Sequence, residues 1–480
     1  MKHFHIIFSA ACLFASNSFS QNVGIGTISP TEKLHVVGNI KNDTIKPNAI
    51  KLLPNAGNGK ILTSDATGNA SWQKGIIDTG VGFGPWGDCS VNNISEYNPV
   101  VDPTGTADDY FGGSTSISGN FAIVGAYNDD VGVNINQGSA SIFQFNGTNW
   151  VFMQKLTDAT GAMGDFFGSS VSISGNYAIV GSYADDVGAN VDQGSASIYF
   201  YNGTTWLFMQ KITDSNGAAS DYFGISCSIS GNYAIAGSFS DDVGAIADQG
   251  SVSIFFYNGT SWSNVQKLTD VAGATGDYFG VSCAINGNYL VVGESGDDVG
   301  VNSNQGSVLM YRFNNVSWVL TQKTTDAGNN ANTNYGSSVS ISGAYLIVGA
   351  YTDGFGGNFN NGSATIYQYN GSNWVLMQKL IKTNQTNLDY FGNSVSISGN
   401  YALVGAPGSS LGTTTQEGSA TLYMRLGTGW KKLQYITDPG GNPVDLLGTS
   451  CGVDGVSMRF IIGATGYGNK SGIVLFGKIN

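Results

Sequence analysis

Residues 221–242 read DYFGISCSISGNYAIAGSFSDD, and close copies of this stretch recur along most of the chain. Glycine falls at positions 112, 168, 224, 280, 336, 392 and 448, a constant step of 56 residues, and tryptophan keeps the same step from 150 to 430. A fixed period of this length is the sequence signature of a repeat architecture. The chain therefore contains seven units built on one plan.

Each unit contains four short runs with the character of β-strands. In the second unit they span 169–174, 176–182, 195–201 and 205–212, and the first run alternates Ser with Val and Ile as a half-buried strand does. Asn202-Gly203 predicts a type I′ turn between the last two runs, because both residues accept positive φ. The predicted fold class is all-β, a seven-bladed β-propeller of four-stranded antiparallel blades, in which stacking buries the faces that one blade cannot bury alone.

The boundaries of the propeller follow from its ends. The last unit supplies only three strand-like runs after residue 447. Residues 92–101, just before the first unit, place apolar residues where the fourth strands of the other units have them. We expect residues 92–101 to be the fourth strand of blade seven, because this pairing removes an exposed sheet edge. The propeller is then residues 92–480, and residues 76–91 are a linker.

The N-terminus has the pattern of an export signal. Lys2 precedes an apolar run, and small residues stand before Gln21, so residues 1–20 are predicted to be a signal peptide. No later apolar stretch is long enough to span a membrane. We expect a protein that is secreted or held on the outer cell surface.

Composition narrows the classes of partner and of chemistry. The net charge of −13 disfavours nucleic acid as a partner. Cys227, Cys283 and Cys451 occupy one repeat position that other units fill with Val, so they are predicted to be buried thiols without disulfides. The propeller contains no His, which leaves no Ser-His-Asp or zinc site and predicts that the protein is not an enzyme. A carboxylate-pair polysaccharide hydrolase stays open as an alternative, since Asp is plentiful.

The repeats resemble a known family. Phe-Gly pairs at 111, 167, 223, 279 and 391, followed by Gly-Ala-Pro at 405–407 or variants of it, are similar to the FG-GAP repeat of integrin α-subunit propellers and their bacterial relatives. The resemblance implies an extracellular ligand-binding or adhesion propeller. Many members hold calcium between the two halves of the repeat, but Ser-Ile-Ser-Gly-Asn is too short and too poor in carboxylates for that site. The family's usual metal site is therefore not transferred to this chain.

A second resemblance covers residues 22–73. Segments such as NVGIGTISPTEKLHVVGNI look like the short modules that open tail-fibre-like surface proteins of Bacteroidetes-type bacteria. We therefore expect a small β-rich surface module over residues 21–75. Because such modules often form intertwined trimers, a homotrimer is a further hypothesis.

The acidic residues gather in two long connections of each unit, which strand direction places on one face of the disc. Asp pairs stand in the connection between the second and third strands of the first four units, and the later units lose them. We expect a partner, either an extracellular protein or a glycan, to bind this face through a set of loop residues: Asp129, Asp130, Asp185, Asp186, Asp241, Asp242, Asp297, Asp298, Tyr127 and Tyr183.

Two interpretations of the aspartates are open. In one they cap loop backbone and keep the protein soluble. In the other, two sets of three hold Ca²⁺, which prefers carboxylate and carbonyl ligands: Asp185, Asp186 and Asp192, and Asp241, Asp242 and Asp248. The tyrosines that begin these loops either stack on a partner or are buried beneath the loop.

The sequence as a whole favours a binding or adhesion protein. The alternatives are a structural spacer without a ligand of its own and the carboxylate-dependent hydrolase.

Overall fold

The computed structural model describes residues 98–480 apart from 327, 329, 355–358, 384–385, 411–415 and 439–441, together with four short strands before residue 98. The chain divides into two compact units, residues 1–75 and 76–480. In the first unit, β1 (Val23–Ile25) pairs in parallel with β2 (Leu34–Val36), and β3 (Lys60–Ser64) pairs antiparallel with β4 (Ala70–Lys74). The predicted signal peptide and linker lie outside the described residues, as does most of the predicted module 21–75.

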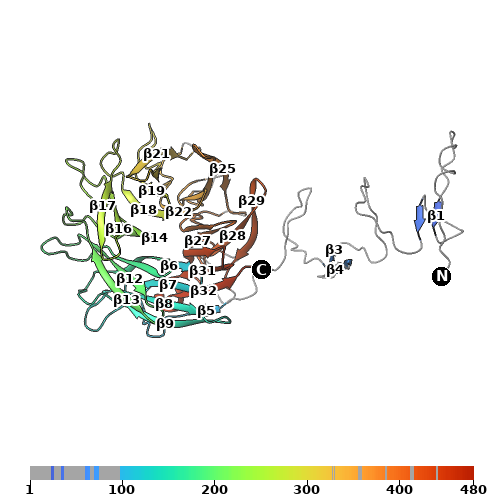
Figure 1. Cartoon of the computed structure of the whole chain (residues 1–480), viewed down its shortest axis with the longest axis horizontal. Helices are drawn as coiled ribbons and strands as arrows, with labels where there is room; N and C mark the ends of the chain where they lie inside the picture. The colour runs from blue at the N-terminus through green and yellow to red at the C-terminus, as the bar shows by residue number, and fades with distance from the viewer. Residues whose placement is uncertain are drawn as a thin grey trace. The chain divides into compact units, whose positions relative to one another are not determined.

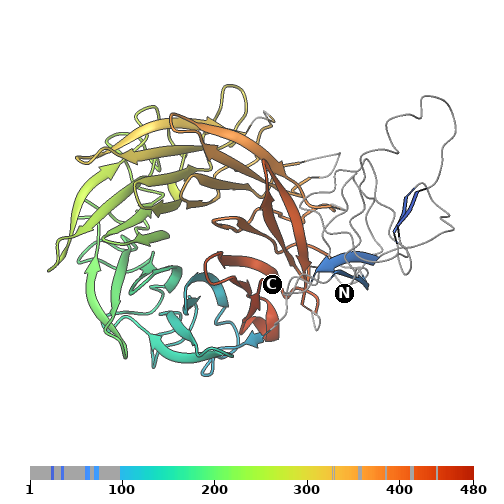
Figure 2. The same cartoon turned by 45° about the vertical axis from the view of Figure 1, so that its right-hand side comes forward.

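The second unit is a seven-bladed propeller of antiparallel four-stranded sheets, as the repeat predicts (Figures 1 and 2). Blade one is β6 (Phe111–Ser118), β7 (Phe121–Ala126), β8 (Ser139–Phe145) and β9 (Trp150–Leu156). Blade two is β10 (Phe167–Ser174), β11 (Tyr177–Ser182), β12 (Ser195–Tyr201) and β13 (Trp206–Ile212). Blade three is β14 (Ser226–Ser230), β15 (Tyr233–Ser238), β16 (Ser251–Tyr257) and β17 (Trp262–Leu268). Blade four is β18 (Phe279–Asn286), β19 (Tyr289–Glu294), β20 (Ser307–Phe313) and β21 (Trp318–Thr325).

The ring closes by joining the two ends of this unit. Blade five is β22 (Ser338–Ser342), β23 (Tyr345–Ala350), β24 (Ser363–Tyr369) and β25 (Trp374–Leu380). Blade six is β26 (Val395–Ser398), β27 (Tyr401–Ala406), β28 (Ser419–Leu426) and β29 (Gly429–Ile436). Blade seven is β30 (Leu447–Asp454), β31 (Arg459–Ala464), β32 (Ile473–Lys478) and β5 (Asn98–Val100). In Figure 2 the red C-terminal strands lie beside the cyan first blade. The closing strand β5 lies within residues 92–101, and the part before residue 98 is not described.

One turn differs from its prediction. Tyr201 pairs with Trp206, so four residues connect β12 to β13 and not the two of a type I′ turn. Asn202 is not at positive φ; its side-chain oxygen accepts the backbone N–H groups of Thr204 and Thr205, both at 2.9 Å. The Asn side chain thus replaces the backbone hydrogen bonding that a two-residue turn would use.

Helical structure is nearly absent from the described residues. The turn α1 (Tyr467–Lys470) is irregular, because Gly468 and Asn469 have positive φ. No helix among the described residues is long and apolar enough to cross a bilayer.

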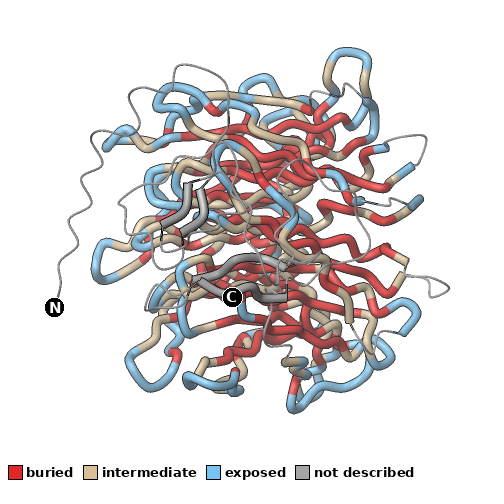
Figure 3. The backbone as a smooth tube through the Cα atoms, turned by 90° about the vertical axis from the view of Figure 1, so that its right-hand side faces the viewer, coloured by how far each residue is buried: buried red, intermediate tan, exposed pale blue. Residues whose placement is uncertain are grey.

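The hydrophobic core lies between neighbouring blades. Ile142 and Leu156 of blade one pack with Phe167, Ile173 and Trp206 of blade two, and the other six interfaces hold clusters of the same kind. Figure 3 shows the buried residues concentrated in the strands and the exposed residues in the connections. The Trp column therefore packs between blades, as its fixed spacing suggests.

The two halves of the repeated motif meet across each interface. A Cβ on Gly125 of blade one would lie 2.0 Å from the carbonyl oxygen of Gly168 in blade two, so no larger residue fits there. The same Gly168 oxygen accepts the Ser114 hydroxyl at 2.7 Å. Equivalent Ser-to-Gly bonds join all seven blades in a closed belt around the axis, and Ser450 completes it by donating to Gly112 at 2.7 Å.

Candidate functional site

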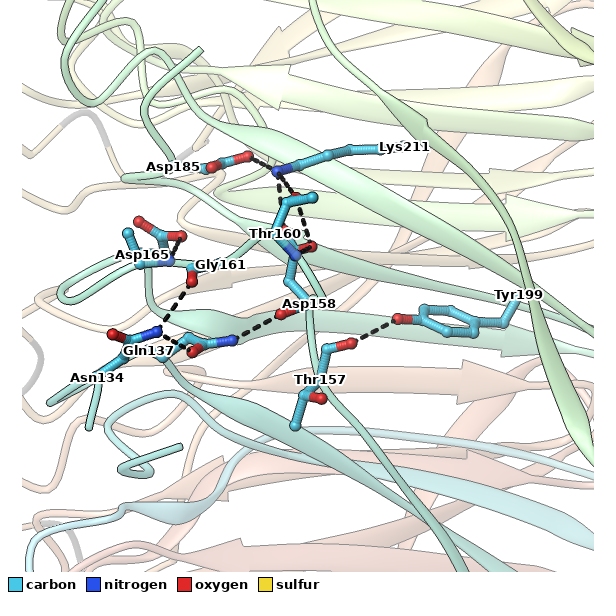
Figure 4. A network of polar contacts seen from close by, with 11 residues as sticks. Asn134, Gln137, Thr157, Asp158, Thr160, Gly161, Asp165, Asp185, Tyr199 and Lys211 are labelled. Carbon is cyan, nitrogen blue, oxygen red and sulfur yellow. Dashed lines mark hydrogen bonds and ion pairs between the residues drawn. The ribbon is translucent and has the colours of Figure 1, made fainter. Parts of the chain in front are cut away.

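The long connections form one continuous face, here called the loop face: the connections between second and third strands, such as 183–194, and those between blades, such as 157–166. They pack on each other across blade boundaries. Gly164 N–H donates to the Ile135 carbonyl at 3.0 Å, and the Gln137 side chain donates to the Asp158 carbonyl at 2.7 Å (Figure 4). The loop face is thus an ordered surface whose loops support one another.

The first Asp of each pair is buried against a lysine. In blade two, Lys211 of β13 lies between Asp185 and Asp158, the latter 2.8 Å away (Figure 4). Blades one to five each have such a lysine cluster: Lys155 with Asp102 and Asp129, Lys211 with Asp158 and Asp185, Lys267 with Asp214 and Asp241, Lys323 with Asp270 and Asp297, and Lys379 with Asp326 and Asp353.

These ion pairs set the charges of the cluster. Burial alone would lower the pKa of Lys211. Its hydrogen bonds and ion pairs with Asp158 and Asp185 outweigh burial, so the pKa of Lys211 lies above its usual value. Burial would raise the pKa of Asp158, whereas Lys211 and Thr160 together hold it below its usual value. Lys211 and Asp158 are therefore held in their charged forms, and the ion pairs join each blade to the end of the preceding one.

The second Asp of each pair is exposed and caps its own loop. The side-chain oxygen of Asp186 accepts the backbone N–H of Asp192 at 2.9 Å, and Asp192 is held at φ 53°. The same bond is made by Asp130 to Asn136, Asp242 to Asp248, and Asp298 to Asn304. This geometry matches the loop-capping interpretation of the aspartates.

The residues of the calcium alternative are not assembled as one ligand set. Asp185 and Asp241 face lysines, whose positive charge opposes a bound cation, while Asp186 and Asp242 turn to backbone N–H groups. Within the described residues, no three His, Cys, Asp or Glu side chains are grouped so that they could hold a metal ion.

The distribution of the first Asp of each pair has a structural cause. The first Asp is present in each blade that has the lysine, and blade six exchanges the whole set: Lys382 stands where Asp158 does, Ser409 where Asp185 does, and Tyr435 where Lys211 does. Lys382 pairs with Asp389 at 2.9 Å and donates to Ser409, whose hydroxyl lies 3.2 Å from that of Tyr435. Ser409 is fully buried and Lys382 is 7% exposed, so this group lies inside the interface between blades five and six.

Blade four carries an additional acid that the repeat did not suggest. Glu294 replaces Ser182 of blade two, is fully buried, and lies 2.8 Å from Lys323, which also serves Asp270 and Asp297. Burial raises the pKa of Glu294 to about 7, although Lys323 acts against this rise. Three carboxylates therefore share one ammonium group at this interface.

The Asp that opens the Asp-Phe-Phe-Gly stretch of blade two and the Asp-Tyr-Phe-Gly stretch of blade three is a buried loop cap. Asp165 accepts the backbone N–H of Ala162 at 2.6 Å, and Asp221 accepts that of Ala218 at the same distance. Burial raises the pKa of both carboxyl groups to about 6. These side chains are committed to holding the inter-blade loop.

Tyr127 and Tyr183 are half-buried and belong to an aromatic series. Tyr127 stacks on Tyr110 with ring centroids 5.3 Å apart, and Tyr183 stacks on Phe166 at 5.2 Å. The contacts continue through blades three and four by Tyr222, Phe239 and Tyr278. Tyr110, Phe166, Tyr222 and Tyr278 all have φ between 55° and 59°, which is unfavourable for an aromatic residue and requires support from the packed loops.

Apolar side chains project from the tips of the same loops. Val133, Val271 and Val301 are 94%, 101% and 97% exposed, and each lies beyond the network that holds its loop together. Further exposed apolar residues of this face are Ile135, Met163, Val191, Phe359 and Val444. At these positions the apolar side chains contribute almost no burial to the folded chain.

The lysine column escaped the sequence interpretation, although it had a signal. Lys155, Lys211, Lys267, Lys323 and Lys379 keep the same step of 56 residues as the glycines. The lysine is present in each blade that retains the first Asp and absent from the other two. Comparing the lysine positions with the positions of the first Asp would have predicted these ion pairs from the sequence.

Short turns on one face and long, mutually supported loops on the other define a propeller in which a rigid scaffold presents a variable surface. The FG-GAP repeat model matches residues 98–143, 150–199, 206–255, 262–311, 318–367 and 374–423, and the chain belongs to this family. Each of these segments begins in the fourth strand of one blade and ends in the third strand of the next.

Other comparisons add little. No curated protein matches the chain. Among solved structures, a "putative 6-phosphogluconolactonase" from Bacteroides fragilis is 11% identical with a TM-score of 0.46, and covers 72% of this chain and 96% of its own. A protein of unknown function from Desulfotomaculum acetoxidans is also 11% identical, with a TM-score of 0.42 and coverages of 68% and 86%. Similarity at this level carries no inference about activity.

Proposed function

We propose that this chain is a non-enzymatic extracellular adhesion protein that binds a protein or glycan partner through its loop face. The observation that carries the proposal is a set of nearly fully exposed apolar residues, Val133 in blade one, Val271 between blades three and four, and Val301 in blade four, on loops that the hydrogen-bond network holds in place. Exposed aspartates such as Asp186 and Asp242 stand in the same loops and give the face a negative charge. A rigid, mixed apolar and acidic surface suits recognition of a partner.

The two alternatives are less well supported. A spacer needs no exposed apolar loop tips, since these lower solubility without adding stability. A carboxylate-pair hydrolase needs two free acids, whereas Asp129, Asp185 and Asp241 are paired with lysines. Export to the cell surface remains part of the proposal and rests on the sequence of residues 1–20.

The test is binding of the full chain to an array of glycans and extracellular matrix proteins. The variant V133S/V271S/V301S should bind its partner at least tenfold more weakly, because these side chains are replaced without touching the core. The matched control is V316S/V456S, since these valines are 87% and 92% exposed on the opposite face. Equal loss in the two variants, or no loss in the first, would refute the loop face as the binding surface.

A further inference from the structure

The short turns form the face of the propeller opposite the loop face, here called the turn face: the turns between first and second strands, such as 175–176, and those between third and fourth strands, such as 202–205. All three arginines of the chain lie at this face, Arg312 in blade four, Arg425 in blade six and Arg459 in blade seven. Exposed lysines accompany them in blades six and seven: Lys431, Lys432 and Lys478. This part of the turn face is therefore basic, although the chain has a net charge of −13.

Neutral groups hold these arginines in place. The Arg459 guanidinium lies over the Phe145 ring, 3.7 Å from its centroid, and that of Arg425 lies 4.8 Å from the centroid of the Tyr345 ring. In the described part of the chain, the only acidic side chain at the turn face is that of Asp454, which is buried and accepts backbone N–H groups of nearby turns. The positive charge of the face is thus left to attract an anionic partner.

Each arginine has an exposed apolar residue within four positions of it: Val316 near Arg312, Leu426 near Arg425, and Val456 near Arg459. Val316 and Val456 are 87% and 92% exposed at the tips of their turns. In blades one, two, three and five, which have no arginine, the turn between the third and fourth strands reads Asn-Gly followed by Thr or Ser. Cations and apolar tips therefore occur together on the turn face.

The acidic loop face is too distant to cancel this charge. The strand β20, which links the two faces in blade four, has seven residues and is about 23 Å long at roughly 3.3 Å per residue. Exposed charges are screened beyond about 8 Å at physiological ionic strength. An anionic surface that meets the turn face is therefore attracted by its cations and hardly repelled by the loop aspartates.

We propose that the turn face docks on an anionic lipid bilayer. Lys and Arg side chains near such a surface are attracted to its charged headgroups, and apolar side chains beside them enter the boundary between headgroups and acyl chains. Arginine suits this role because its guanidinium group binds phosphate oxygens in pairs. Cations alone would fit any polyanion, whereas the exposed apolar residues favour a surface that has a hydrocarbon layer.

The path of the chain agrees with this orientation. The strand β5 begins at Asn98, opposite Phe476, and runs from the turn face toward the loop face. The residues before Asn98, with the expected export signal and surface module, are therefore attached at the turn face. The inference rests on the surface location in the proposed function, and it adds that the loop face points away from the bilayer, where a partner can reach it.

The test is co-sedimentation of the full chain with vesicles of phosphatidylcholine alone and of phosphatidylcholine mixed with an equal part of phosphatidylglycerol. We expect binding to the mixed vesicles only, and its loss in about 1 M salt, where the screening length is about 3 Å. The variant K431S/K432N copies Ser263 and Asn264 of blade three and should raise the Kd at least tenfold, since each cation near the surface strengthens binding roughly fivefold. V316S/V456S should raise the Kd at least threefold, because serine gains less from entering the lipid boundary. The matched control V133S/V271S/V301S, on the loop face, should leave the Kd unchanged.

Equal binding to both kinds of vesicle, no binding to either, or an unchanged Kd in K431S/K432N or in V316S/V456S would overturn the inference. A soluble acidic polysaccharide that binds as tightly as the vesicles, and responds to K431S/K432N but not to V316S/V456S, would also overturn it by identifying a dissolved polyanion as the partner. Sedimentation without vesicles that K431S/K432N abolishes would assign the turn face to a second copy of the chain and not to a bilayer.

The same variants separate this inference from the proposed function. If a partner is lost only in V133S/V271S/V301S and no vesicle binds, the loop-face proposal survives and the docking fails. If vesicles bind as expected and no partner responds to the loop-tip variant, the docking stands and the loop-face proposal fails.

Discussion

Replacing Glu294 by Gln should stabilise the propeller at alkaline pH and leave it unchanged in acid. Glu294 is a third carboxylate on Lys323, beside Asp270 and Asp297, and burial raises its pKa from 4.5 to about 7. Gln has the shape of the protonated acid and no charge. The variant therefore measures what ionising Glu294 costs the folded chain.

The sign follows from proton binding. Below pH 4.5 the acid is protonated in both folded and unfolded chains and contributes nothing. Between pH 4.5 and 7 the unfolded chain releases the proton while the folded chain keeps it, so stability falls as pH rises. Above pH 7 both are ionised, and the full penalty of about 3 kcal/mol applies, at 1.36 kcal/mol for each pKa unit.

Urea unfolding at pH 5 and pH 8 would measure this difference. At pH 8 the variant should exceed the parent by about 3 kcal/mol, which is roughly 4 °C in melting temperature if unfolding residues 98–480 gains about 2.1 cal/mol/K per residue. The matched reverse variant is S182E, which places a third carboxylate on Lys211 in blade two and should create the same loss above pH 7. A variant E294Q with no gain at pH 8 and an unchanged pH slope would refute this account of the cluster.

Three further outcomes are expected. Lys211→Met leaves Asp158 and Asp185 buried without a cation and should lower the free energy of unfolding, measured in urea, by about 3–5 kcal/mol. The variant D158K/D185S/K211Y copies the residues of blade six and should recover much of this loss. Equal instability of the two variants would contradict the pairing. Because the loop aspartates are committed to lysines and backbone, calcium or EDTA should move the melting temperature by less than about 1 °C, and a rise of several degrees with calcium would restore the calcium alternative. Burial raises the pKa of Cys283 and of Cys451 to about 12. At pH 8 the native protein should therefore resist alkylation at its three buried propeller thiols, Cys227, Cys283 and Cys451, until it unfolds. Mass spectrometry of the alkylated protein would measure this.

The seven-bladed architecture could be predicted from the sequence because the same strand pattern recurs in each repeat. Strand positions in blade two were predicted to within two residues, and both long connections lie on one face as strand direction required. Turn chemistry was harder, since Asn202 uses its side chain where a two-residue turn would use backbone. Propensity alone does not separate these solutions.

The acidic loops show where sequence reasoning stopped. Lys211 is 26 residues from Asp185 and 53 from Asp158, so no local pattern joins them. Without this contact, the loss of Asp pairs after blade four suggested that the first four blades form a binding surface. With it, the first Asp follows the lysine through blade five, where Asp353 pairs with Lys379, and the exposed loop tips become the better guide to binding.

The exchanged set in blade six also bears on how such a chain finds its own register. Nearly identical repeats can dock on the wrong neighbour, or on the same repeat of another molecule, while they fold. Lys382 at the end of blade five would meet Lys211 or Lys267 in a misplaced neighbour and would suffer like-charge repulsion, but it meets Ser409 and Tyr435 in blade six. The interface between blades five and six therefore disfavours pairing with the wrong blade at this point of the ring.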